Sequence, residues 1–153
     1  MISKNQGQSI LEVLFATTVV ALVLVAILST IVASLRNARS SMEQSQATGY
    51  ANEVLEWLRR ERDAIGWVEF SNNLPSVGNE VTYCFDTLPS TVSNIGGYSG
   101  ECVDTKIPDT AFIRQLQLSR LSAEEVEATV VVTRPSRSGT TETVLKGRLT
   151  QWQ

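Results

Sequence analysis

VLFATTVVALVLVAILSTIVASL, residues 13–35, is the stretch that decides how this chain is organised. It contains 23 consecutive residues without a charge. At about 1.5 Å per residue, a helix of this length crosses the ~30 Å hydrocarbon core of a bilayer. Its apolar residues occupy every side of the helix rather than one stripe, unlike the amphipathic helices of soluble domains. The stretch therefore predicts a single membrane-spanning helix.

The polar and small residues inside this run are compatible with that prediction. Serine and threonine hydroxyls can bond back to helix carbonyls, so they need not interrupt the helix. Alanines allow a second helix to approach closely. The residues concerned are Thr17, Thr18, Ser29 and Thr30, and Ala16, Ala21, Ala26 and Ala33.

A cleaved secretory signal is a weaker interpretation of the same stretch. Such signals have a shorter apolar core that is followed by a small-residue cleavage site, whereas here a helical pattern continues. Lys4 precedes the run and favours a cytoplasmic N-terminus. Arg36 and Arg39 follow it, so the positive-inside rule alone leaves the orientation open.

The chain beyond the run, residues 36–65, predicts an amphipathic continuation of the same helix. No proline or glycine occurs between Gln8 and Thr48, and Gly49 could mark a bend. The charged residues at 56–63 are expected on a solvated face. Gly66 ends the pattern, which predicts one helix from Gln8 to Ile65. Its apolar face comprises Ala47, Ala51, Val54, Leu58 and Ile65.

The remaining residues, 66–153, show the alternation of β-strands. VEATVVVTR (126–134) and TETVLKGRLTQW (141–152) alternate on either side of the turn PSRSG, which predicts an antiparallel hairpin. AFIRQLQLS (111–119) and EVTYCFD (80–86) are expected to be two more strands. Residues 67–70 are compatible with another short strand, and 88–100 with a loop.

The predicted fold class is therefore α+β. A long N-terminal helix with a membrane half (8–35) and an amphipathic half (36–65) packs on a small antiparallel sheet (66–153). A domain of this size makes a marginal core alone, so the helix has to contribute to it.

Cys84 and Cys102 are the two cysteines of the chain. They form no CxxC motif, and two thiols alone make a poor metal site. A disulfide between them is expected if the domain lies outside the cytoplasm, where it would stabilise the fold by roughly 3 kcal/mol. The alternative is a pair of reduced, buried cysteines in a cytosolic domain.

Composition argues against most enzyme classes and against general nucleic-acid binding. The chain has no histidine and a net charge of -3, so we expect no enzymatic activity, metal or cofactor. GGYSG (96–100) lacks the context and the lysine of a phosphate loop. Arg134 and Arg137 at the hairpin tip could meet DNA, but two arginines in a turn are common, and a DNA or surface partner has no specific support.

GQSILEV, residues 7–13, gives the chain its family resemblance. A short polar leader with a lysine precedes Gly7, Glu12 follows five residues later, and the long apolar run comes next. This arrangement resembles the type IV pilin-like superfamily, which comprises pilins, minor pilins and type II secretion pseudopilins. The resemblance is close over residues 3–35, and TVLKGRLTQW resembles the last strand of I-type pseudopilins and V-type minor pilins.

The resemblance implies that residues 1–7 are a prepilin leader. A prepilin peptidase would cut between Gly7 and Gln8 and methylate the new amino group of Gln8. The residue matching Glu12 serves this methylation and filament assembly. The chain would then be a structural subunit, a minor pilin or pseudopilin, located in the cytoplasmic membrane before assembly and in an extracytoplasmic or cell-surface pilus afterwards. Its partners would be other pilin subunits, the peptidase, membrane lipid, and indirectly an assembly platform protein with its ATPase.

Elementary electrostatics agrees with the role that the resemblance gives Glu12. Cleavage before Gln8 creates a cationic amine, and a neighbour's carboxylate can neutralise it strongly in a dry helical bundle. Gln8 is a departure, because most family members have phenylalanine there and a free N-terminal glutamine can cyclise and lose its charge. The apolar run also lacks the proline and glycine of many major pilins. The alternative function is a membrane-anchored extracytoplasmic binding domain that never polymerises.

Overall fold

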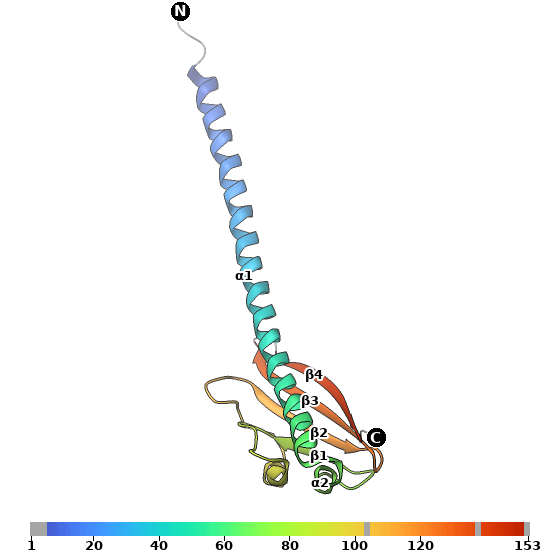
Figure 1. Cartoon of the computed structure of the whole chain (residues 1–153). Helices are drawn as coiled ribbons and strands as arrows, with labels where there is room; N and C mark the ends of the chain where they lie inside the picture. The colour runs from blue at the N-terminus through green and yellow to red at the C-terminus, as the bar shows by residue number, and fades with distance from the viewer. Residues whose placement is uncertain (1–5, 103–104, 137–138, 152–153) are drawn as a thin grey trace, which may run out of the picture. The chain divides into compact units, whose positions relative to one another are not determined.

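We describe the protein from a computed structural model that covers residues 6–102, 105–136 and 139–151. Its elements follow one another as α1 (Gln6–Ile65), α2 (Trp67–Asn72), β1 (Glu80–Cys84), the 3-10 helix η1 (Val92–Tyr98), β2 (Ile113–Arg120), β3 (Glu125–Ser136) and β4 (Gly139–Thr150) (Figure 1). The chain divides into a first unit that ends at Glu43 and a second unit, Gln44–Gln153. Helix α1 belongs to both, and each unit is described by itself.

The second unit contains a sheet with the strand order β1-β2-β3-β4, in which every neighbouring pair is antiparallel. The last part of α1 runs across one face of this sheet (Figure 1). The predicted α+β class and all four strands are confirmed. The hairpin of β3 and β4 is longer than expected, since its register extends to Ser136 opposite Gly139. Arg137 and Trp152 lie outside the described residues.

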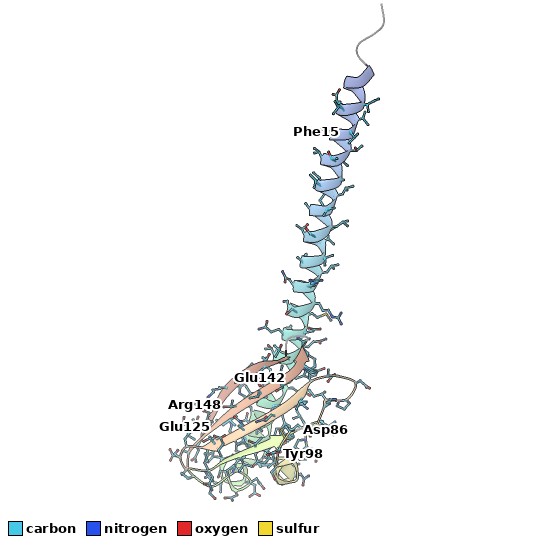
Figure 2. The ribbon with its side chains drawn as sticks, turned by 180° about the vertical axis from the view of Figure 1, so that it is seen from behind. Phe15, Asp86, Tyr98, Glu125, Glu142 and Arg148 are labelled. Atoms are coloured by element: carbon cyan, nitrogen blue, oxygen red, sulfur yellow. A yellow bond between two sulfur atoms is a disulfide. The ribbon has the colours of Figure 1, made fainter. Side chains whose placement is uncertain are left out.

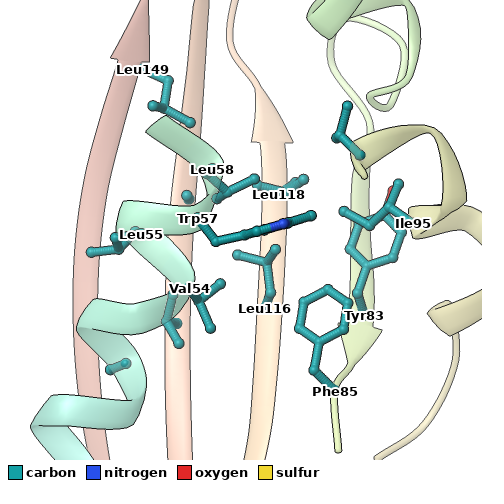
Figure 3. Close-up of a cluster of buried hydrophobic side chains, with 14 of the residues drawn as sticks. Val54, Leu55, Trp57, Leu58, Tyr83, Phe85, Ile95, Leu116, Leu118 and Leu149 are labelled. Atoms are coloured by element: carbon teal, nitrogen blue, oxygen red, sulfur yellow. The ribbon is translucent and has the colours of Figure 1, made fainter. Parts of the chain in front are cut away.

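The core lies between α1 and the sheet. Figure 3 shows Trp57 and Leu58 of α1 against Leu116 and Leu118 of β2. Inward-facing positions two residues apart on β3 are fully buried or nearly so, as the period of a half-buried strand requires. The buried α1 residues are Ala47, Ala51, Val54, Leu55, Trp57 and Leu58, and those of β3 are Val126, Ala128, Val130 and Val132.

The end of α1 differs from the sequence prediction in two places. Ile65 was assigned to the apolar face, but it is exposed because Gly66 turns the chain away with a φ of 78°. Residues 67–70 form part of α2 and no strand. Trp67 and Phe70 are one helical turn apart and pack together at 6.0 Å between ring centroids, and the Trp67 indole donates to the Ala123 carbonyl.

The predicted loop 88–100 contains η1, a short helix that sequence patterning did not reveal. Val92 and Ile95 are three residues apart, lie on the same side of a 3-10 helix and are buried in the core. The backbone N–H of Val92 donates to Oε2 of Glu61 at 2.8 Å. A carboxylate of α1 therefore holds the start of η1.

Two further polar contacts join α1 to the sheet. Arg114 of β2 is 2% exposed and forms an ion pair with Glu53 at 2.6 Å. Arg62, expected on the solvated face, is buried and donates through Nη1 to the Thr150 carbonyl at 3.4 Å. An unpaired buried charge would cost several kcal/mol, so the contacts of these arginines make their burial tolerable.

The backbone of β4 approaches α1 most closely at Gly147. A Cβ placed on Gly147 would lie 3.1 Å from a terminal carbon of Leu55, whose side chain is 6% exposed. Gly49, in contrast, is exposed within α1 and has nothing within 4 Å of an added Cβ. The helix continues through it without the interruption that its sequence allows.

We therefore expect opposite effects from filling these two glycines. Gly147→Val should destabilise the second unit by about 1–3 kcal/mol, because Leu55 has to leave its packed position. Gly49→Ala should stabilise it by about 0.5–1 kcal/mol through helix propensity. Chemical denaturation of both variants measures the two shifts. A Gly147→Val protein as stable as the wild type would show that the close approach imposes no constraint.

Candidate functional site: the apolar half of α1

The first unit exposes the long apolar run on every side of α1. Every described residue from Ile10 to Ser41 is classed as exposed. Among the large apolar side chains, Phe15 is 73% exposed and Leu11 72%. Soluble monomers rarely leave a continuous apolar surface of this extent in water. By length and composition α1 could span a membrane, and its apolar segment lies near the N-terminus.

The hydroxyl groups in this run bond within their own helix. Thr17 and Thr18 donate to carbonyls three residues earlier at 3.0 and 2.8 Å, and Ser29 and Thr30 do the same at 2.8 and 2.7 Å. No hydroxyl proton of these four residues is left for a neighbour. These hydroxyls therefore form hydrogen bonds within the helix and do not interrupt it, as the sequence predicts.

Small residues form shallow grooves along the helix surface. One groove lies around Ala16, Thr17 and Ala21, with Val13, Val20 and Leu24 as its walls. A second lies around Ser29 and Ala33 and ends at Arg36. A partner helix could place its larger side chains into such depressions, which is how helices approach one another in the absence of water.

Glu12 lies one residue before the uncharged run and is exposed. The structure gives it no hydrogen-bond or ion-pair partner among the residues that it describes. Arg36 is the next charged residue, about 36 Å further along the helix axis. The helix therefore has an acidic group at one end of its apolar segment and a basic group at the other.

The two residues of the predicted cleavage site lie in the first turn of α1. The backbone of Gly7 and Gln8 is helical, but their side chains and residues 1–5 are outside the described part of the chain. Gln8 and Glu12 are four residues apart, so they lie on the same side of the helix. The other two predicted site residues, Cys84 and Cys102, belong to the second unit.

The predicted disulfide is present. Cys84, the last residue of β1, is bonded to Cys102, and their Cα atoms are 5.3 Å apart. Segment 99–100 lies along the outer edge of β1, where Tyr83 and Ser99 form a bridge and the Gly100 N–H donates to the Thr82 carbonyl at 3.2 Å. The bond thus holds this segment against the sheet. Burial raises the pKa of the Tyr83 hydroxyl.

The second unit also contains ion pairs between β3 and β4 that the sequence analysis did not identify. On the sheet face opposite α1, Arg148 pairs with Glu125 at 3.0 Å, and both residues are labelled in Figure 2. On the same face Lys146 pairs with Glu127 at 3.5 Å. Both pairs are diagonal across the β3–β4 ladder, in which Arg148 lies opposite Glu127 and Lys146 opposite Thr129. Arg148 also approaches Glu127 directly opposite it, at 3.7 Å. Strand alternation could have revealed them, because all four residues occupy the non-core positions of a predicted hairpin.

Comparison with protein-family models, curated proteins and solved structures finds no match for this chain. The architecture itself, an apolar N-terminal helix that continues onto an antiparallel sheet, is compatible with a pilin-like fold. The functional argument therefore depends on the residues of the apolar segment and on their chemistry.

A charge placed in the middle of the exposed run tests whether it enters a membrane. Leu24→Arg should cost about 2.5–3.5 kcal/mol of insertion free energy, because Leu24 lies near the centre of the segment. Leu35→Arg, next to Arg36, is the matched control and should cost little. The fraction of full-length chain that resists alkaline extraction from membranes measures both. Equal resistance of the Leu24→Arg and wild-type chains would contradict membrane insertion of α1.

Proposed function

We propose that this chain is a structural subunit of a type IV pilus or type II secretion-like filament, and specifically a minor pilin or pseudopilin. It is processed after Gly7 and inserted in the cytoplasmic membrane through α1. It then assembles with other subunits through the same helix. One observation carries the proposal: the carboxylate of Glu12 immediately precedes a fully exposed apolar run and has no ion-pair or hydrogen-bond partner among the residues that the structure describes.

The exposed run supports burial by other helices as well as by lipid. Lipid covers an apolar helix but offers no counter-charge for Glu12. A bundle of copies covers the apolar surface and supplies one amine per subunit, created by cleavage before Gln8. In a dry bundle this pairing is strong, and it would set the axial register of neighbours as a buried polar residue does in a coiled coil.

The disulfide supports the location of the second unit outside the cytoplasm. Disulfides persist in oxidising compartments and are rare in reducing ones. With Lys4 and the leader on the cytoplasmic side, a single crossing of α1 brings Cys84 and Cys102 to the opposite side. This orientation makes the second unit the exposed head of the subunit, as the family resemblance implies.

A membrane-anchored binding domain that does not polymerise is the alternative. It explains the apolar run and the disulfide equally well. It gives no reason for an acidic residue next to the run, since such an anchor has no new amine to neutralise. The two functions differ in whether the leader is removed.

Mass spectrometry of the N-terminal peptide from native cells separates them. We expect a chain that begins at Gln8 and carries one added methyl group, which retains the charge opposite Glu12. A chain that begins at Met1 would support the anchored binding domain. Pyroglutamate at Gln8 in assembled filaments would contradict the pairing of the amine with Glu12.

Removing the charge of Glu12 tests the assembly step. Glu12→Gln should reduce incorporation into filaments well over tenfold, because an unpaired amine in a dry bundle costs about 3–5 kcal/mol. Glu56→Gln is the matched control, since it removes an exposed carboxylate from the same helix within the second unit. Quantitative blotting of sheared filaments and of cell membranes measures incorporation. Normal incorporation of the Glu12→Gln chain would refute the proposed pairing.

A further inference from the structure

The outer edge of β4 is the longest uncovered strand edge in the described part of the chain. Strand β4 has twelve residues, and its burial pattern shows most of them exposed. The strand order places it at one end of the sheet, while the other end, β1, is partly covered by the segment around Ser99. An open edge of this kind presents unpaired N–H and C=O groups to any strand that fits.

The edge lacks two of the devices that usually prevent pairing. All twelve residues of β4 pair with β3 in continuous register, so there is no bulge, and β4 contains no proline. Its protection is limited to three charged residues, Glu142, Lys146 and Arg148, which lie on the sheet face opposite α1. Figure 2 shows two of them, Glu142 and Arg148, along β4.

The hydrogen-bond pattern of the sheet shows which β4 groups point outward. The Phe85 N–H donates to the Arg114 carbonyl, so Tyr83 and Leu116 also form a hydrogen-bonded pair. The backbone groups of Leu116 thus point toward β1, so Leu116 and Val130, which lie opposite one another, form a non-hydrogen-bonded pair. The groups of Val130 therefore point toward β4, where Val130 exchanges hydrogen bonds with Leu145. The backbone groups of the even-numbered residues, Glu142, Val144, Lys146 and Arg148, therefore point away from β3.

These outward-pointing residues are complementary to themselves in an antiparallel arrangement. If Val144 pairs with Val144 of a second copy, Glu142 lies opposite Lys146 on both sides of the centre. This register places even-numbered residues of one β4 opposite even-numbered residues of the other. Their outward N–H and C=O groups can therefore bond to each other, and their side chains lie on the same face of the joined sheet. The structure gives Glu142 no ion pair among the described residues, and Lys146 is held by Glu127 only at 3.5 Å. Both charges are thus available to a partner.

We propose that the β4 edge binds the β4 edge of a second copy of this chain in the register Val144 opposite Val144, joining two sheets of four strands into one of eight. In this register Glu142 and Lys146 pair across the contact, and Arg148 faces Thr140 of the other copy. The shifted register with Leu145 opposite Leu145 would instead pair Glu142 with Arg148, which Glu125 already holds at 3.0 Å. The two-fold axis is perpendicular to the sheet, as an isologous contact requires.

This symmetry has a directional consequence. A two-fold axis perpendicular to the sheet reverses every direction in its plane, including that of the part of α1 that crosses the sheet. Copies within one filament run the same way. If the proposed filament function holds, the contact therefore joins heads from two filaments or two cell surfaces that meet in opposite orientation. The edge contact itself uses only the second unit and does not depend on that function.

Charge exchange between two copies provides the test. Full-length chains in detergent micelles are compared by light scattering, with association through α1 common to all variants. Glu142→Lys and Lys146→Glu should each weaken self-association at least about tenfold, because each puts like charges opposite one another. Mixing the two variants should restore association to the wild-type level, and so should the double variant E142K/K146E. Thermal melting monitors whether each variant is folded.

A second pair of variants tests the edge and its register. Val144→Pro removes an outward N–H and should weaken self-association as strongly, whereas Val144→Thr should leave it unchanged. Val144→Cys should form a symmetric intermolecular disulfide on mild oxidation, since paired Cα atoms lie about 5.5 Å apart. Thr150→Cys, on the same edge, should not. Unchanged association in both charge variants, failure of the mixture to associate, or equal crosslinking of the two cysteine variants would overturn the proposal.

Discussion

The structure depends on one constraint: a single helix carries an apolar surface on all sides in its first half and packs one apolar side on a sheet in its second half. Up to Leu35 α1 is apolar on all sides and exposes that surface entirely. From Ala47 it is apolar on one side only, and this side is buried against the sheet. The core of the second unit contains no residue before Ala47. The apolar half therefore adds no side chain to the described core of the second unit.

Polar groups at the helix–sheet boundary give the second unit a defined arrangement. Glu53, Glu61 and Arg62 of α1 each contact a different part of the domain: β2, the start of η1 and the end of β4. Apolar packing alone tolerates small rotations and shifts of a helix over a sheet. Three directional contacts on separate elements restrict those movements. The Cys84–Cys102 bond adds a covalent restraint at the β1 side.

Much of this fold could be predicted from periodicity, since the second half of α1 and all four strands show the pattern that their burial requires. The first half was recognised by its uncharged run, which is apolar on every side. The cysteine count left a disulfide and two reduced cysteines as alternatives, and the structure shows the disulfide. Arg114 and Arg62 could not be recognised as buried, because their burial depends on partners that are distant in sequence. Residues 67–70 were compatible with a short strand by sequence but belong to α2, since four residues are too few to distinguish a helical spacing from alternation. Of the candidate site, the sequence located Gln8 and Glu12 on one helix and put Gly7 in the leader before it, whereas α1 begins at Gln6. The proposed pairing of Glu12 needs a second chain.

The internally bonded hydroxyls of the apolar segment also affect its mechanics. The hydroxyls of this segment donate to carbonyls of their own helix; they belong to Thr17, Thr18, Ser29 and Thr30. Side-by-side helices would therefore meet through dispersion contacts, which have no preferred direction. Such surfaces offer little resistance to sliding. In a bundle held this way, tension would be opposed mainly by isolated charged contacts at the helix ends, and the bundle would stretch by slippage before any helix unfolds.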